Sequence, residues 1–129
     1  MKLLVDTQAF LWFLAGDRRL RRPVRRRLED ASQERFLSIA SVWEMAIKVS
    51  LQKLELDDPL EDVVTAGTRD AGIALLGVSK DHALRVATLP WHHRDPFDRL
   101  LIAQAAEDGY TVVTRDGSLD AYGIPLLKA

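Results

Sequence analysis

The chain has 129 residues, of which 47% are hydrophobic and 29% are charged, and its formal net charge at pH 7 is −1. This length and composition predict one globular domain, 1–129, with a substantial core, and they exclude a global basic field that would attract nucleic acid. The absence of cysteine excludes disulfides, thiolate–metal sites and a cysteine nucleophile.

The predicted elements alternate between strands and helices along the whole chain. Strands are predicted at 3–5, 35–39, 73–78, 110–114 and 124–127. Helices are predicted at 7–15, from Pro23 past Leu28, at 41–51, at 59–70, after Ser79 up to Pro90, and at 95–108. Such alternation predicts a three-layer α/β/α sandwich with a mostly parallel sheet. The first residues do not resemble a signal peptide, and no stretch has the ~20 apolar residues of a membrane span, so we expect a cytoplasmic protein.

The segment 95–116 is predicted to form a helix, a turn and a strand with an acid at each end. Asp95 is suited to cap the helix, Pro96 to begin it and Gly109 to end it. Asp98 then falls in the first turn, and Asp116 lies just past the carboxyl end of the following strand. In open α/β sheets, ligands bind at that edge.

Two more acids are predicted to reach the same edge, because Asp6 follows the first strand and Glu44 lies near the start of the helix after the second. Each acid also has an ordinary explanation. Asp6 is a candidate N-cap, and Asp116 in Arg-Asp-Gly is a candidate turn residue. Asp98 can complement the helix dipole, and Glu44 completes a capping box with Ser41.

A cluster of carboxylates favours a divalent cation, because like charges at close range are unfavourable unless a cation offsets them. Mg²⁺ and Mn²⁺ prefer hard carboxylate oxygens, so the pattern indicates one of these ions, bound with water for attack on phosphate.

Several neighbours are candidates for supporting roles. Lys48 lies one turn after Glu44, where it can pair with that acid or reduce the charge of the cluster. Thr7 and Thr114 flank the acids and can hold water on the ion. The adjacent His92 and His93 can bind metal, shuttle protons or orient their loop.

Basic residues are concentrated between positions 18 and 27, which hold seven of the eighteen in the chain. The candidates for RNA contact are Arg18, Arg19, Arg21, Arg22 and Arg25. The run is either a solvated helix face or a phosphate-binding patch whose affinity depends strongly on salt.

Four motifs together resemble the PIN-domain nucleases, and specifically the ribonuclease toxins of the VapC type from toxin–antitoxin pairs. They are LLVDT at 3–7, SVWEMAIK at 41–48, HHRDPFDRLLIAQA at 92–105 and VVTRD at 112–116. The resemblance maps the four acids of the family onto Asp6, Glu44, Asp98 and Asp116. Asp95 is an alternative for the third acid, which we keep as a cap or supporting residue.

The resemblance implies a five-stranded parallel sheet of order 3-2-1-4-5. It also implies metal-dependent hydrolysis of single-stranded or loop RNA that leaves 5′-phosphate and 3′-hydroxyl ends. Asp6 and Asp98 would be the main metal ligands, with Glu44 and Asp116 completing the site directly or through water. The implied partners are a second copy of the chain and a small antitoxin. The apolar helix at 8–15, with Trp12, is a candidate surface for the antitoxin, although core packing also explains most of it.

Three other functions fit parts of the pattern. A receiver-like or phosphoryl-transfer domain uses a differently placed second acid, and the residues Asp6-Thr7-Gln8 lack it. A non-catalytic RNA-binding module of the same fold would not need four acids. A structure-specific DNA endonuclease stays open, because the residues predict phosphate and metal binding but not the sugar.

Overall fold

The computed structural model describes residues 1–129 and shows a parallel sheet between two layers of helices. The elements in chain order are β1 (Lys2–Val5), α1 (Thr7–Ala15), α2 (Arg22–Glu29), β2 (Glu34–Ser38), α3 (Ile39–Ser50), α4 (Leu60–Thr65), η1 (Ala66–Asp70), β3 (Ala74–Leu76), α5 (Lys80–Arg85), η2 (Val86–Thr88), α6 (Pro96–Asp108), β4 (Thr111–Thr114), η3 (Gly117–Tyr122) and β5 (Leu126–Lys128). None of the helices has the length and apolar composition needed to cross a lipid bilayer.

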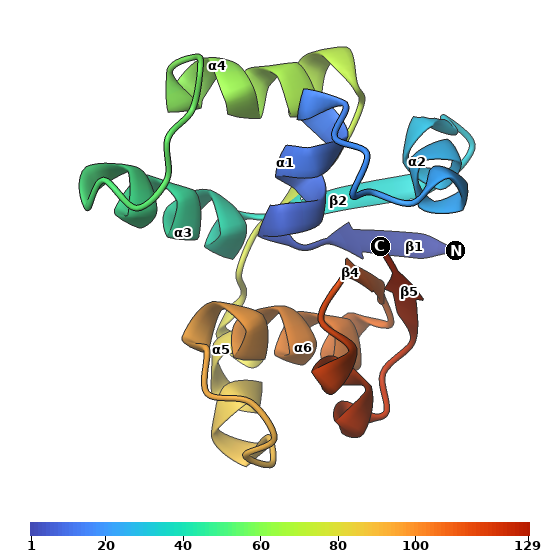
Figure 1. Cartoon of the computed structure of the whole chain (residues 1–129). Coiled ribbons are helices and arrows are strands. Elements are labelled where there is room, and N and C mark those ends of the chain that lie inside the picture. The colour runs from blue at the N-terminus through green and yellow to red at the C-terminus, as the bar shows by residue number, and fades with distance from the viewer.

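The sheet has the order β3-β2-β1-β4-β5, and every neighbouring pair is parallel. This confirms the predicted fold class and strand order. In Figure 1, α1, α2 and α4 lie on one side of the sheet and α5 and α6 lie on the other. Because all five strands run the same way, their carboxyl ends meet at one edge, where the following helices begin.

Alternate residues of the strands pack into two separate cores, one on each face of the sheet. Leu3 and Val5 of β1 pack with Phe10 of α1 and the helices on that side. Leu4, between them, packs with Leu101 and the residues around α6. A buried face on both sides of β1 explains why its sequence, Leu-Leu-Val, is continuously apolar.

The helix that carries Asp98 begins and ends at the residues predicted for it. The Asp95 carboxylate caps α6 by accepting hydrogen bonds from the backbone N–H groups of Phe97 and Asp98 at 2.8 and 3.1 Å. Pro96 occupies the first helical position, and Gly109 ends the helix with a φ of 77°, a left-handed conformation that glycine adopts without strain.

All five strands have boundaries that differ from the predicted ones. The first begins at Lys2 and not at Leu3. The second strand covers 34–38 and not 35–39, because Ser38 caps α3 through Ala40 N–H. The third covers only 74–76, since its last partner on β2 is Ser38. The fourth begins at residue 111. The fifth is 126–128 and not 124–127, because Pro125 has no N–H to donate to the sheet.

Candidate functional site

Four acidic side chains from separate elements come together at the carboxyl edge of the sheet. Asp6 directly follows β1, and Asp116 lies two residues after β4. Asp98 is the third residue of α6, whose amino end lies at this edge because α6 runs back along the sheet to enter β4. Glu44 lies in the second turn of α3, which begins where β2 ends.

Asp6 is the N-cap of α1 and also belongs to the acidic cluster. Its carboxylate accepts a hydrogen bond from Ala9 N–H at 2.8 Å, and the residue is only 9% exposed. Burial raises the pKa of Asp6, the charges of Glu44 and Asp116 add to the rise, and the Thr114 hydroxyl opposes it. The cap interaction predicted as an alternative is therefore present, but it does not remove Asp6 from the cluster.

Glu44 does not form the predicted capping box. The helix begins at Ile39 and not at 41, because Ser38 supplies the cap three residues before Ser41. Glu44 instead accepts hydrogen bonds from the Thr7 hydroxyl and from the Lys48 ammonium group, both at 2.6 Å.

These two donors hold a carboxylate that is only 7% exposed. The hydrogen bond to Glu44 raises the pKa of Lys48, so the lysine stays charged beside the acids. The hydroxyl hydrogen of Thr7 is thus donated to Glu44 in this structure.

Asp98 is the acid whose pKa is most clearly raised, to about 7. Burial is the largest cause, followed by the negative charge of Asp95; Asp6 and Glu44 raise the pKa further, and His93 lowers it. The side chain is 25% exposed. Asp98 therefore lies near half-protonation at neutral pH unless a cation is present.

Asp116 caps η3, and hydrogen bonds hold both of its carboxylate oxygens. Ser118 donates to Oδ1 from its hydroxyl at 2.6 Å and from its backbone at 3.0 Å, while His93 Nε2 lies 2.9 Å from Oδ2. The Ser118 hydroxyl is the main cause of a lowered pKa for Asp116. The backbone N–H of Asp116 donates to the Thr114 hydroxyl at 3.0 Å.

The sequence left three roles open for His93 and assigned none to Arg99. His93 Nε2 also lies 3.5 Å from an Asp98 oxygen. His93, Asp98 and Asp116 each offer one ligand atom, and these three atoms lie within 4.8 Å of one another. Arg99 is 2% exposed and donates to carbonyl groups of the 86–93 segment, including that of His93. Both residues belong to the motif at 92–105, which was the available signal.

His92 takes no part in the acidic cluster. Its ring packs against the ring of Tyr122 with the centroids 5.1 Å apart.

The arginine run divides into residues held by the protein and residues free in solvent. Arg25 donates to the carbonyls of Trp12, Phe13 and Asp17 at the end of α1. Three others also have partners: Arg19 pairs with Asp17 and lies over the Trp12 ring, Arg21 contacts the Lys128 carbonyl and Arg27 contacts Met1. The exposed residues without a hydrogen bond or ion pair are Arg18, Arg22 and Arg26.

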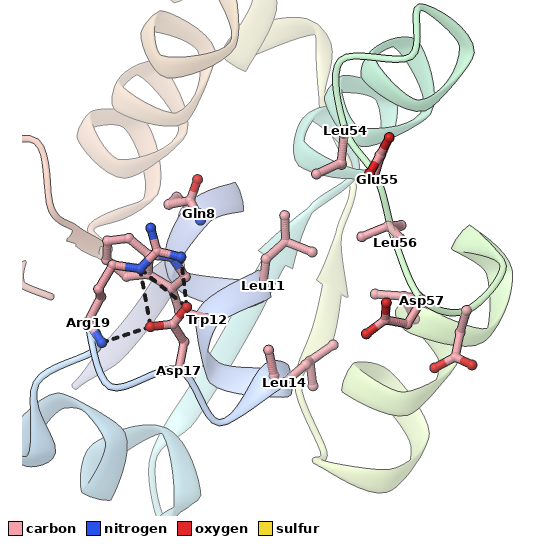
Figure 2. A pocket seen from close by; sticks show the side chains of 13 residues that line it. Gln8, Leu11, Trp12, Leu14, Asp17, Arg19, Leu54, Glu55, Leu56 and Asp57 are labelled. Atoms are coloured by element: carbon pink, nitrogen blue, oxygen red, sulfur yellow. Dashed lines mark hydrogen bonds and ion pairs between the residues drawn. The ribbon is translucent and has the colours of Figure 1, made fainter.

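An apolar groove of about 320 Å³ lies apart from the acids, between α1 and the segment that connects α3 to α4. Figure 2 shows Leu11 and Leu14 of α1 facing Leu54 and Leu56 across this groove. Its rim is acidic. The charged residues around it are Asp17, Glu55, Asp57 and Asp58, together with Arg19, which pairs with Asp17.

A five-stranded parallel sheet of this order, with acids at its carboxyl edge, defines an α/β protein with a candidate metal site. The family model of the PIN domain matches residues 3–125, and the chain belongs to the PIN domain family. Proteins with this domain are generally nucleases that depend on a divalent metal. No curated protein matches the chain.

Solved structures of toxin–antitoxin complexes share the fold. VapBC2 from Rickettsia felis, bound to a DNA fragment from its promoter, is 10% identical with a TM-score of 0.74, and the match covers 99% of this chain and 98% of that one. DNA-bound VapBC from Salmonella typhimurium is 16% identical with a TM-score of 0.68, covering 99% and 98%. A toxin–antitoxin complex from Klebsiella pneumoniae is 20% identical with a TM-score of 0.65, covering 98% and 97%.

Proposed function

We propose that residues 1–129 form one nuclease domain that acts as the toxin of a toxin–antitoxin pair and hydrolyses RNA phosphodiester bonds with Mg²⁺ or Mn²⁺. The observation that carries the proposal is the convergence of four acids from separate elements, with the pKa of Asp98 raised to about 7. Membership of the PIN domain family and the likeness to toxin–antitoxin complexes support it. The expected place of action is the cytoplasm, where RNA is available.

The donor set fits a hard divalent cation. All four acids offer carboxylate oxygens, no thiolate is available, and burial and mutual repulsion raise the pKa of Asp6 and Asp98. Asp6 and Asp98 would hold the ion, and Glu44 and Asp116 would complete the site directly or through water. When bound, such an ion supplies a nucleophilic water at neutral pH and stabilises charge on the phosphate.

The surrounding residues orient the acids and limit their repulsion. Thr7 and Lys48 fix both oxygens of Glu44, and the lysine charge partly offsets the cluster. Asp95 holds the amino end of α6, which sets the position of Asp98. No protein nucleophile is required when a metal-activated water attacks the phosphate directly.

Cleavage of a mixed single-stranded RNA by the purified chain, with Mg²⁺, Mn²⁺ or EDTA, tests the proposal. We expect cleavage only with a divalent ion, and its loss in Asp6→Asn and in Asp98→Asn. Asp62→Asn, at the third position of α4 on an exposed surface, is the matched control and should cleave normally. Cleavage that survives both site variants would refute the assignment.

The same assay separates the alternatives. Binding of RNA without cleavage under any metal condition would indicate a non-catalytic RNA-binding module. Parallel incubation with single-stranded, duplex and branched DNA tests for a structure-specific DNA endonuclease, which would cleave DNA in preference to RNA.

We propose that Arg18 and Arg22 contact RNA phosphates, whereas Arg25 supports the fold. Arg18 and Arg22 line a pocket of about 450 Å³ at the end of α1. Arg115, next to Asp116, connects this surface to the acids, because its guanidinium donates to the Arg19 carbonyl at 3.2 Å. An RNA chain lying across these arginines would therefore pass close to the cluster.

We propose that the antitoxin inserts a segment with apolar and basic side chains into the groove between α1 and the α3–α4 connection. The apolar walls of the groove would contact the apolar side chains of the antitoxin, and the acidic rim would attract its basic side chains. Leu14→Glu should then abolish co-purification with the co-expressed antitoxin. Leu84→Glu, an exposed leucine on α5 away from the groove, should not; equal loss in both variants would contradict the groove assignment.

A further inference from the structure

The His93 imidazole lies between two acids of the proposed site, and its two nitrogens have different partners. Nε2 is 2.9 Å from Asp116 Oδ2 and 3.5 Å from Asp98 Oδ2. On the other side of the ring, Nδ1 accepts a hydrogen bond from the backbone N–H of Asp95 at 3.1 Å. The side chain is 19% exposed, so the ring faces the protein on most sides.

These partners determine which nitrogen carries the proton. A backbone N–H can only donate, so Nδ1 must present its lone pair to Asp95. An ionised carboxylate can only accept, so Nε2 must present a hydrogen to Asp116. Both contacts are satisfied together by the neutral tautomer with its proton on Nε2.

An imidazole with two carboxylates nearby could itself be read as a metal-ligand set, and the tautomer argues against that reading. To bind a cation, Nε2 would have to give up its proton. The proton would then sit on Nδ1, where it would face the Asp95 N–H and cost that residue its hydrogen bond.

The backbone on both sides of His93 is also held, so the loop keeps the imidazole between the Asp95 N–H and the two acids. Arg99 donates to the His93 carbonyl at 3.4 Å and to the Pro90 carbonyl at 2.9 Å, which ties the loop to α6. Asp95 holds the other end of the loop through its cap interactions.

We propose that His93 is a positioning residue whose Nε2–H spaces Asp98 and Asp116 for a divalent cation, and that it is not a ligand of that cation. This inference rests on the proposed metal-dependent function. It assigns His93 the task of fixing one Asp116 oxygen while Ser118 fixes the other. Partners of this kind around metal ligands typically change metal affinity or activity by about 10–100-fold when removed.

The first experiment locates the proton by imidazole ¹⁵N NMR of the full chain, free and with Mg²⁺. We expect a proton on His93 Nε2 in both states. A proton on Nδ1 in the free protein, or loss of the Nε2 proton on adding Mg²⁺, would overturn the proposal. The measurement needs no RNA and no catalytic turnover.

The second experiment compares two variants that each keep one half of the histidine. His93→Asn keeps an acceptor for the Asp95 N–H but has no donor that reaches Asp116. His93→Gln places an amide N–H near the position of Nε2. His92→Gln, on the neighbouring histidine that packs on Tyr122, is the control.

We expect Mn²⁺ affinity, measured by calorimetry, to fall about 10–100-fold in His93→Asn and to stay close to the wild-type value in His93→Gln and His92→Gln. RNA cleavage at saturating Mn²⁺ should follow the same order. Unchanged Mn²⁺ affinity in His93→Asn, or an equal loss in both His93 variants, would refute the positioning role.

The outcomes also separate this inference from the proposed function. If the wild-type chain binds Mn²⁺ with the expected variant pattern but cleaves no RNA, the nuclease function fails and the role of His93 stands. If the wild-type chain binds no Mn²⁺, both fail.

Discussion

Replacing Asp98 by asparagine should stabilise the metal-free protein, although it should abolish cleavage. The pKa of Asp98 rises from 3.8 to about 7, which at 1.36 kcal/mol per unit is an upper limit of about 4 kcal/mol. Because a quarter of the side chain is exposed, screening reduces this to about 2 kcal/mol. Asparagine also loses the favourable interaction of the Asp98 charge with the dipole of α6, which reduces the gain in stability by roughly 0.5 kcal/mol.

The effect has a defined pH dependence. The folded pKa lies above the unfolded value, so the native state holds the proton more tightly and ionising Asp98 costs stability. The cost is absent below about pH 4, grows as the pH rises toward 7, and is complete above about pH 8. The asparagine variant should therefore exceed the wild type most at about pH 8 and lose its advantage by about pH 5.

Thermal unfolding followed by circular dichroism in EDTA measures this difference. A gain of about 1.5 kcal/mol corresponds to a rise in Tm of about 5 °C for a chain of this size. Adding Mn²⁺ should raise the Tm of the wild type and not that of Asp98→Asn. Asp62→Asn, at the third position of α4, should be neutral or slightly destabilised. If the wild type is as stable as Asp98→Asn at about pH 8 in EDTA, the claim that ionised Asp98 destabilises the metal-free fold is refuted.

Three further experiments test other parts of the structure. Arg99→Leu should lower the free energy of unfolding by about 3–5 kcal/mol in urea titrations, because several buried carbonyls lose a charged donor; a loss below about 1 kcal/mol would contradict this. Gly67→Ala places a methyl group against the Phe10 ring and should cost about 1–3 kcal/mol, partly restored by adding Phe10→Leu. Arg22→Ala should leave the Tm unchanged, weaken RNA binding and reduce the slope of log affinity against log salt by about one. Arg25→Ala should lower the Tm, because its contacts with three backbone carbonyls are lost. A lower Tm in Arg22→Ala, with weaker RNA binding only in Arg25→Ala, would contradict the proposed RNA surface.

The parallel sheet was predictable because each strand has a local signal and the strands alternate with helices, whereas the strand order followed from the resemblance to the PIN-domain nucleases. Continuous apolar runs such as Leu3–Val5 indicate strands buried on both faces, and parallel strands bring their carboxyl ends to one edge. An acid directly after a strand, such as Asp6, therefore has a predictable position. Asp98 was predictable for a similar reason, since Asp95 and Pro96 specify where its helix begins.

Features that depend on contacts between distant segments were not predictable. The pair Ser41 and Glu44 has the spacing of a capping box, but Ser38 is an equally good cap and lies directly after β2. The choice between them depends on where β2 loses its partner strand, and the local sequence does not show that. Arg25 looks like its solvent-exposed neighbours in the sequence, and only the position of α2 against α1 brings it to three carbonyls.

The two outer strands of the sheet limit how this chain can associate with other chains. β3 and β5 contain only three residues each, so each offers a free backbone edge of about 10 Å. An added strand would gain few hydrogen bonds there, which also reduces the risk of edge-to-edge aggregation. We therefore expect stable assembly, with another copy or with a different protein, to use side chain contacts rather than strand addition at these edges.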